Sequence, residues 1–131
     1  MNLEFLDFSY VDVRKNGLSL PQNVKTNINI LSMTRDKDRM NIGFEYLATY
    51  DPDNSSIRIG GTATFSGTEV KTVYDEWTLH KRVSGATGSQ IINTINYSAS
   101  MNAILMSRAM NMSPPVLLPT IRLEEPVKKK K

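Results

Sequence analysis

The chain has 131 residues, of which 40% are hydrophobic and 22% are charged, a composition typical of one globular domain. It contains no cysteine and one histidine, which excludes disulfides, thiolate catalysis and metal sites built from several cysteines or histidines. The formal net charge is +3, but four of the 16 basic residues form the run Lys128–Lys131. We therefore expect a single, nearly neutral domain over residues 1–123 and a charged, disordered tail over residues 124–131.

Alternating apolar and polar residues predict four strands in the first half of the chain, over about 6–13, 28–33, 40–50 and 57–65. The clearest pattern runs from Met40 to Tyr50, where every second residue is apolar. The alternation changes phase near Tyr10 and again at Leu31, which indicates a β-bulge in each of these strands. Gly60-Gly61 indicates a bend or bulge in the fourth strand. Short links between the last three strands predict an antiparallel meander.

The second half of the chain has helical periodicity. Residues 66–69, Ser-Gly-Thr-Glu, have the spacing of a capping box, and apolar residues recur at helical spacing over 70–77. Gly85 and Gly88 predict a break, after which a longer helix runs from about Ser89 to Met112 and ends at a Pro-Pro pair. Four strands followed by two helices predict an α+β fold with two layers, a four-stranded antiparallel sheet covered by two helices.

The long helix is poor in charge. Arg108 is its only charged residue, whereas the surface helices of small domains normally have a charged outer face. Small uncharged side chains take that place here, and they suit contact with a second protein surface. We therefore predict a homo-oligomer whose interface contains Asn93, Asn96, Ser100 and Asn102. An ordinary core helix with a polar outer face is the alternative interpretation.

No group of residues predicts catalysis or metal binding. His80 has no nucleophile or orienting carboxylate in a recognisable motif around it. The segment 51–55 resembles the start of a calcium loop but lacks the required Gly and distal Glu. We expect that the protein is not an enzyme and has no catalytic residue, metal or cofactor. The sequence shows no signal peptide and no membrane span, so we expect a cytoplasmic protein without membrane insertion.

Methionine is concentrated near the end of the long helix, at positions 101, 106, 110 and 112. Methionine side chains are flexible and polarisable, and they suit surfaces that must fit many partners. Four methionines in a helix more often fill a core. The adjacent apolar segment 114–119, Pro-Pro-Val-Leu-Leu-Pro, makes an adaptable apolar groove the stronger prediction.

Residues 104–119 resemble the SecB-type protein-export chaperones, whose long helix ends with an apolar turn, Ser-Arg and a small residue before a Pro-rich apolar segment. Gly60-Gly61 followed by Phe65-Ser66 is similar to the Gly-Gly and Phe-Ser of that family. The predicted order of elements is also that of the family, so the resemblance covers about residues 5–123. It implies an ATP-independent cytosolic holdase that binds unfolded or partly folded polypeptides in apolar grooves. It also implies a dimer of dimers with the long helices at the tetramer interface.

The resemblance further implies which residues bind the polypeptide. The aromatic part of the groove is expected to contain Phe44, Tyr46, Ile57, Ile59, Phe65 and Trp77. The other wall is expected to contain Met110, Met112, Val116, Leu117 and Leu118. The alternative is that half of these residues simply fill the core.

The chain departs from the family in two places. Arg58 stands where the fourth strand of the family has an acidic residue that helps to dock the SecA motor. The acidic tail of the family, which carries a zinc-binding motif, is replaced by Val127 and four lysines. Both departures argue against docking to SecA. The resemblance then implies a divergent relative that serves export or one specific client, such as an antitoxin.

Two other functions are alternatives to the chaperone. A nucleic-acid-binding α+β domain would use an open sheet face, with Tyr46 and Tyr50 stacking on bases, together with the lysine tail. The nearly neutral body argues against nucleic acid as a partner. A two-layer enzyme of hot-dog type would need an acid/base pair, and none is identifiable.

Overall fold

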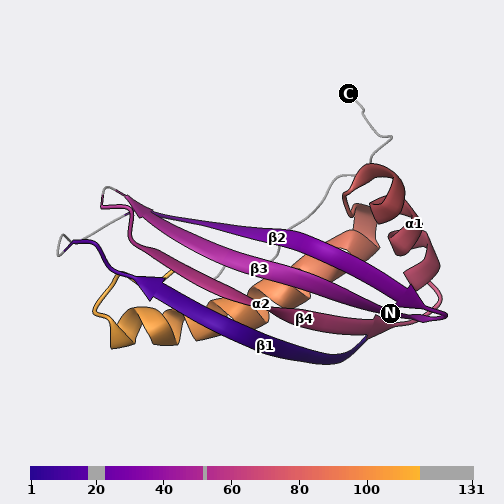
Figure 1. The fold of residues 1–131 in the computed structure, drawn as a ribbon, viewed down its shortest axis with the longest axis horizontal. Coiled ribbons are helices and arrows are strands. Elements are labelled where there is room, and N and C mark those ends of the chain that lie inside the picture. The colour runs from indigo at the N-terminus through magenta and orange to yellow at the C-terminus, as the bar shows by residue number, and fades with distance from the viewer. Residues whose placement is uncertain (18–22, 52, 116–131) are drawn as a thin grey trace.

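The computed structural model describes residues 1–17, 23–51 and 53–115. Its elements, in order, are β1 (Asn2–Arg14), β2 (Asn23–Asp36), β3 (Arg39–Asp51), β4 (Ser56–Ser66), α1 (Val70–His80) and α2 (Gly85–Ala109). The four strands form one antiparallel sheet, and the two helices cover one face of it (Figure 1). This confirms the predicted α+β fold. The predicted tail, 124–131, lies outside the described residues.

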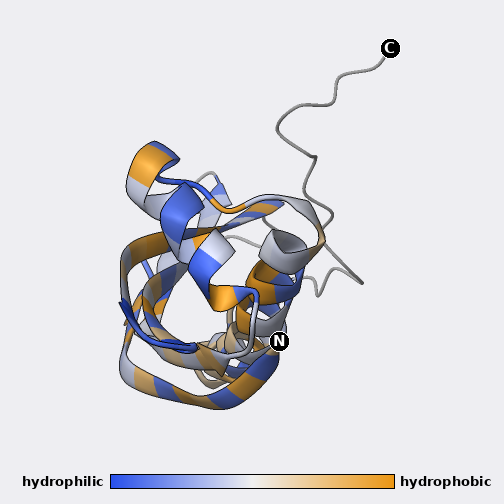
Figure 2. Cartoon of the chain, turned by 90° about the vertical axis from the view of Figure 1, so that its right-hand side faces the viewer, coloured by the Kyte–Doolittle hydropathy of each residue, from blue (hydrophilic) through white to orange (hydrophobic). Residues whose placement is uncertain are grey.

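The strand order in the sheet is β1-β4-β3-β2. Strands β2, β3 and β4 form the predicted meander, and β1 pairs with β4. The two edges of the sheet are therefore β1 and β2, which lie on opposite sides. The sheet is curved and wraps around α2, with α1 at one end of the molecule (Figure 2).

Both predicted bulges are present, as register shifts between Phe8 and Tyr10 and between Ile30 and Ser32. A third shift, between Leu3 and Phe5, has no counterpart in the sequence pattern. The pairing of β3 with β4 is regular throughout. The irregularity near Gly60-Gly61 lies in the pairing of β4 with β1, where the extra residue is on β1 between Phe8 and Tyr10.

The two glycines of β4 are required because other atoms occupy the space of their side chains. A Cβ atom at Gly60 would lie 2.3 Å from the ring of Tyr10, and one at Gly61 would lie 2.1 Å from the backbone oxygen of Asp7. The ring of Tyr10 is exposed and can move, but the backbone of β1 cannot move without loss of its pairing. Gly61 therefore allows the close approach of β1 to β4.

The core lies between the inner face of the sheet and the helices. Every second residue of β3, from Met40 to Tyr50, is almost fully buried. One cluster lies under α1 and the first half of α2 and includes Ile42 and Ile91. A second cluster lies under the C-terminal half of α2 and includes Tyr46 and Ala103. The period-2 pattern of β3 thus reports the buried face correctly.

Two details of the helices differ from the sequence-based prediction. Helix α2 begins at Gly85. Gly88 is therefore a buried residue of this helix and not part of a break before it. The predicted capping box does not form, because the Ser66 hydroxyl donates to the carboxylate of Glu4. Glu69 instead lies 3.3 Å from the amino group of Met1. Tertiary contacts here replace the local cap that the spacing suggested.

We predict that Gly61→Ala lowers the free energy of unfolding by about 1–3 kcal/mol, because the added methyl group would collide with the backbone of β1. Urea denaturation measures this change. Thr62→Ala, at the next and exposed position, is the matched control and should change stability by less than about 0.5 kcal/mol. A Gly61→Ala variant as stable as the wild type would contradict the close approach of β1 to β4.

Candidate functional site

Most of the predicted aromatic groove is core. Phe44, Tyr46, Ile57, Ile59 and Phe65 are at most 1% exposed and lie beneath the helices of their own chain. A polypeptide cannot reach them in this structure. The alternation along β3 and β4 identified an apolar face, but it carried no information on what covers that face.

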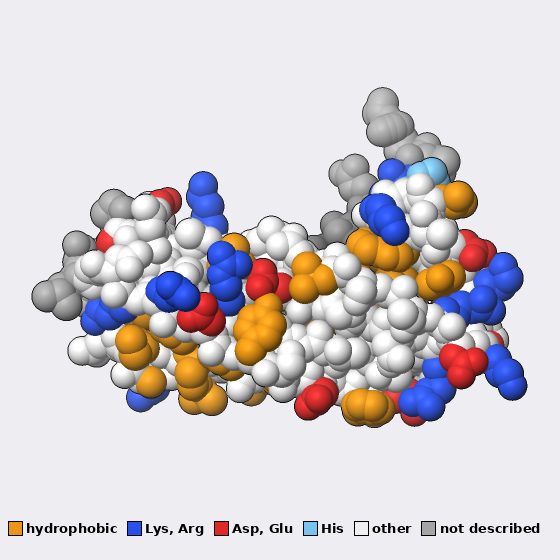
Figure 3. Space-filling view, viewed as in Figure 1, with side chains coloured by type: hydrophobic (Ala, Val, Ile, Leu, Met, Phe, Trp, Pro, Cys, Tyr) orange, Lys and Arg blue, Asp and Glu red, His pale blue; other side chains and the backbone are white. Residues whose placement is uncertain are grey.

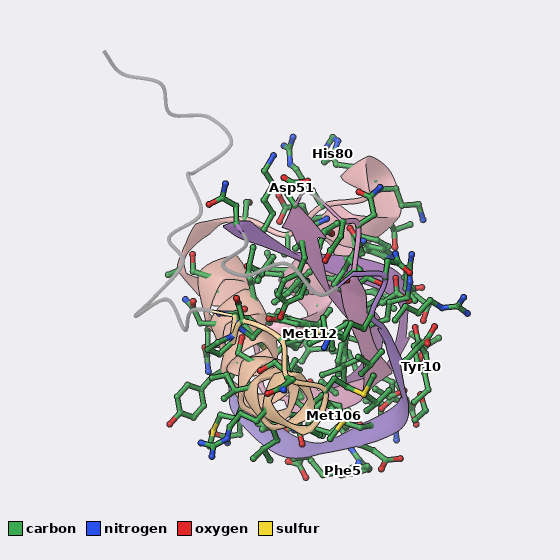
Figure 4. All side chains as sticks on the ribbon, turned by 90° about the vertical axis from the view of Figure 1, so that its left-hand side faces the viewer. Phe5, Tyr10, Asp51, His80, Met106 and Met112 are labelled. Atoms are coloured by element: carbon green, nitrogen blue, oxygen red, sulfur yellow. The ribbon has the colours of Figure 1, made fainter. Side chains whose placement is uncertain are left out.

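The remaining predicted groove residues have different positions. Met112 packs in the second core cluster at 7% exposure, and Met110 is exposed just beyond the end of α2. Figure 4 shows Met106 and Met112 between the end of α2 and the sheet, whereas Phe5 and Tyr10 lie outside on β1. Trp77 is partly buried beside the first cluster. Val116, Leu117 and Leu118 lie outside the described residues.

An open groove of about 450 Å³ lies elsewhere, between the edge strand β2 and the helices. In the space-filling view the surface is hollowed along this edge, beside α1 (Figure 3). The volume is within the roughly 300–1,000 Å³ typical of ligand sites. The strand contributes residues 26–30, the end of α1 and the following turn contribute Trp77, Lys81, Arg82 and Val83, and α2 contributes Ile92 and Asn96.

The groove exists because α2 leaves part of β2 uncovered. Ile28 and Ile30 point to the inner face of the sheet and pack against core clusters, yet both are only partly buried. Asn27 and Asn29 alternate with them and are exposed. Because β2 is an edge strand, alternate backbone N–H and C=O groups of residues 26–30 face away from β3.

The turn after α1 places two cations beside the groove. Lys81 adopts a left-handed conformation with φ of 55°, and its backbone N–H donates to the carbonyl oxygen of Trp77. This turn brings the Lys81 ammonium nitrogen to 5.3 Å from the centre of the Trp77 ring. Arg82 donates through Nε to the Glu76 carboxylate at 3.2 Å. Among the described residues, Lys81 makes no such ion pair.

The residues predicted for the oligomer interface divide into two groups. Asn96 is 6% exposed and Ser100 is 2% exposed, so both already face inward within one chain; the prediction that they form an intersubunit surface is wrong for these two. Asn93 and Asn102 are half-buried on the flanks of α2. The outward stripe of the helix is instead apolar and consists of Tyr97, Met101 and Leu105, which are 62%, 48% and 60% exposed.

The inward polar residues of α2 face tyrosines of β3. The hydroxyl of Ser100 donates to Asn96 Oδ1 at 3.3 Å. Burial raises the pKa of Tyr46, and the nearby Ser100 hydroxyl partly offsets this. The Tyr46 hydroxyl is buried and makes no hydrogen bond of regular geometry with the described residues. Small polar side chains here let α2 approach the bulky tyrosines closely.

The outer face of the sheet carries a polar network. The Tyr10 hydroxyl crosses Gly60 and donates to Glu45 Oε2 at 2.5 Å, and Arg58 Nη1 donates to Glu45 Oε1 at 3.2 Å. The hydrogen bond to Glu45 raises the pKa of Tyr10. Tyr46 and Tyr50, the residues considered for base stacking, are on the other face and are fully buried.

Within the described residues, no group of three or more His, Asp or Glu side chains is arranged to hold a metal ion. None of the described helices has the length and apolar character needed to cross a membrane. Comparison with known proteins finds no matching family model, curated protein or solved structure.

Tyr46 and Tyr50 generate a paired prediction, because only one of the two hydroxyls is bonded. The Tyr50 hydroxyl donates to the carbonyl oxygen of Ser113 at 2.6 Å. Tyr50→Phe should therefore lower the free energy of unfolding by about 0.5–1.5 kcal/mol at pH 7, whereas Tyr46→Phe should leave it unchanged or raise it. Urea denaturation of the two variants measures the difference. Equal losses in both would contradict the hydrogen-bond assignment.

The burial of Tyr50 also predicts a loss of stability at alkaline pH. Burial raises the pKa of Tyr50 to about 12, above its value of about 10 in the unfolded chain. Folding therefore favours the neutral phenol. Its contribution to the free energy of unfolding is complete below pH 10 and is lost as the pH rises towards 12. The unfolding free energy of Tyr50→Phe should fall less steeply over this range than that of the wild type. Parallel curves would contradict the prediction.

Proposed function

We propose that this protein is an ATP-independent holdase of the cytoplasm that binds unfolded or partly folded polypeptides in the groove beside β2. The observation that carries the proposal is an open groove whose apolar side chains, Ile28, Ile30, Trp77, Val83 and Ile92, lie along an edge strand. Burial of apolar surface is non-directional, so it recruits many sequences without nucleotide. The backbone groups of an edge strand bind an extended chain whatever its side chains.

The resemblance to the SecB-type chaperones supports the same function. The observed order of four strands, a short helix and a long helix is the order that the resemblance implies. Because one fold hosts many functions, the proposal depends on the groove more than on this order. We propose clients destined for export or a single client such as an antitoxin. Arg58, paired with Glu45 on the outer face, argues against docking to the SecA motor.

The holdase activity is tested by mixing the protein with a chemically unfolded model protein, without ATP, and following aggregation by light scattering. Ile92→Gln should raise the concentration needed for half suppression about tenfold or more, because one anchoring apolar side chain contributes about 1.5–3 kcal/mol. Ile92 lines the groove and is only partly buried, so the helix should remain folded.

Leu79→Gln is the matched control for this experiment. Leu79 is 76% exposed on α1 and does not line the groove, so suppression should be unchanged. Wild-type protein that stays folded but leaves aggregation unaffected would contradict the holdase proposal. Equal suppression by wild type and Ile92→Gln would support the holdase activity but contradict the assignment of client binding to this groove. Substitution of Met112 is not suitable, because its side chain lies in the core.

We further propose that the outward stripe of α2 packs on a second copy of the chain, within a dimer of dimers. Tyr97, Met101 and Leu105 are spaced four residues apart, so they form one line along the helix. In an antiparallel two-fold pair, Met101 would meet Met101 and Tyr97 would meet Leu105 of the other copy. Such a stripe is self-complementary, as a two-fold interface requires.

Met101→Glu should reduce the molar mass measured by light scattering, because the interface would bury unpaired carboxylates. Leu79→Glu, which introduces the same charge at an exposed apolar position of α1, should leave the mass unchanged. A wild-type protein that is monomeric at micromolar concentration would contradict the proposed assembly. An unchanged mass for Met101→Glu would show that another surface mediates it.

A further inference from the structure

Both charged side chains that line the groove are cations. Lys81 and Arg82 lie at one end, and no carboxylate of the described residues lines the cavity. Arg82 is partly neutralised by Glu76, which is 3.2 Å away. Lys81 has no acidic partner among the described residues, and its ammonium group lies over Trp77. The groove thus joins an apolar wall to a cationic end, although the chain without Lys128–Lys131 carries 12 basic and 13 acidic residues.

The geometry suits an extended segment. Residues 26–30 of β2 offer about 13 Å of edge backbone, at about 3.3 Å per residue. On a strand paired with this edge, every second side chain would point towards Ile28, Ile30 and Ile92. Asn96, which is 6% exposed, also lines the groove. Its Oδ1 accepts from Ser100, and its side-chain nitrogen donates to no described residue, so this nitrogen can donate to a carbonyl or carboxylate oxygen of a bound segment.

We propose that the groove selects extended client segments that carry carboxylates among their apolar residues. The apolar side chains of the segment fill the cavity, and a carboxylate at its end pairs with Lys81 and Arg82. This inference rests on the proposed function and names the class of polypeptide that the holdase prefers. Electrostatic complementarity of this kind distinguishes partners that apolar burial alone treats as equal.

The test uses three ten-residue peptides of Val, Leu and Thr that carry two Glu, two Gln or two Lys residues at the same positions. Trp77 is the only tryptophan of the chain and lines the groove, so its fluorescence reports binding directly. At low salt the Glu peptide should bind about five- to tenfold more tightly than the Gln peptide, and the Lys peptide more weakly than either. High salt should reduce this preference.

Lys81→Gln should remove most of the preference for the Glu peptide and leave the affinity for the Gln peptide nearly unchanged. Lys15→Gln is the control, because it removes the same charge far from the groove. Lys15 follows β1 at the opposite edge of the sheet, so this variant should keep the preference. A variant without Lys128–Lys131 should keep it as well. If removal of those lysines abolishes the preference, the tail is its source and the inference is wrong.

Other outcomes separate this inference from the function on which it rests. Equal binding of the three peptides, sensitive to Ile92→Gln, would overturn the charge preference and leave the holdase groove intact. No binding of any peptide by folded protein would overturn both. A single-stranded oligothymidylate that changes Trp77 fluorescence, binds more tightly than the Glu peptide and depends on Lys81 would assign the site to nucleic acid and overturn the proposal.

Discussion

One helix cannot cover four strands, and the other features of this structure follow from that limit. Neighbouring strands lie about 4.8 Å apart, so the two edge strands are roughly 15 Å apart, while a helix with its side chains is about 10–12 Å wide. Helix α2 crosses the sheet diagonally (Figure 1). Helix α1 packs on β2 and β3 at one end. Between the two helices, the edge of β2 stays open, and the groove lies there.

Close packing of α2 over the sheet depends on small residues. Ala99, Ser100 and Ala103 are buried against strands whose inward residues include two tyrosines. This packing leaves the Tyr46 hydroxyl buried without a regular hydrogen bond, while the Tyr50 hydroxyl fixes the segment that follows α2 through Ser113. The inward polar residues Asn96 and Ser100 are therefore a consequence of the contact of α2 with its own sheet. These two residues do not identify a surface for a second subunit.

The sequence was sufficient for the fold because the fold depends on local periodicity. The period-2 pattern from Met40 to Tyr50, the phase changes at the bulges and the order of strands and helices are all short-range signals, and the structure confirms them. The prediction failed where a distant segment decides the outcome. Ser66 bonds Glu4 instead of capping α1, and the inward side of α2 depends on where the sheet lies.

The candidate site was predicted only in part for the same reason. The groove contains Trp77, which the resemblance placed among the polypeptide-binding residues, and Asn96, which was predicted for an oligomer interface instead. Lys81 and Arg82 had no signal in the sequence, because a turn, an edge strand and a helix bring the lining residues together. The alternation of Ile28 and Ile30 was visible in the sequence. The strand order makes β2 an edge strand, and its inward side chains are therefore only partly covered. No local sequence pattern encodes strand order.

Helix α2 separates the two proposed interactions by its own geometry. Successive residues of an α-helix are rotated by about 100°, since a turn contains 3.6 residues. Asn96 lines the groove, so Tyr97, the next residue, points about a quarter of a turn away from it and begins the outward stripe. A second copy packed on Tyr97, Met101 and Leu105 would therefore leave the groove open beside β2. The proposed assembly and the proposed client binding would use adjacent faces of one helix, and neither would have to displace the other.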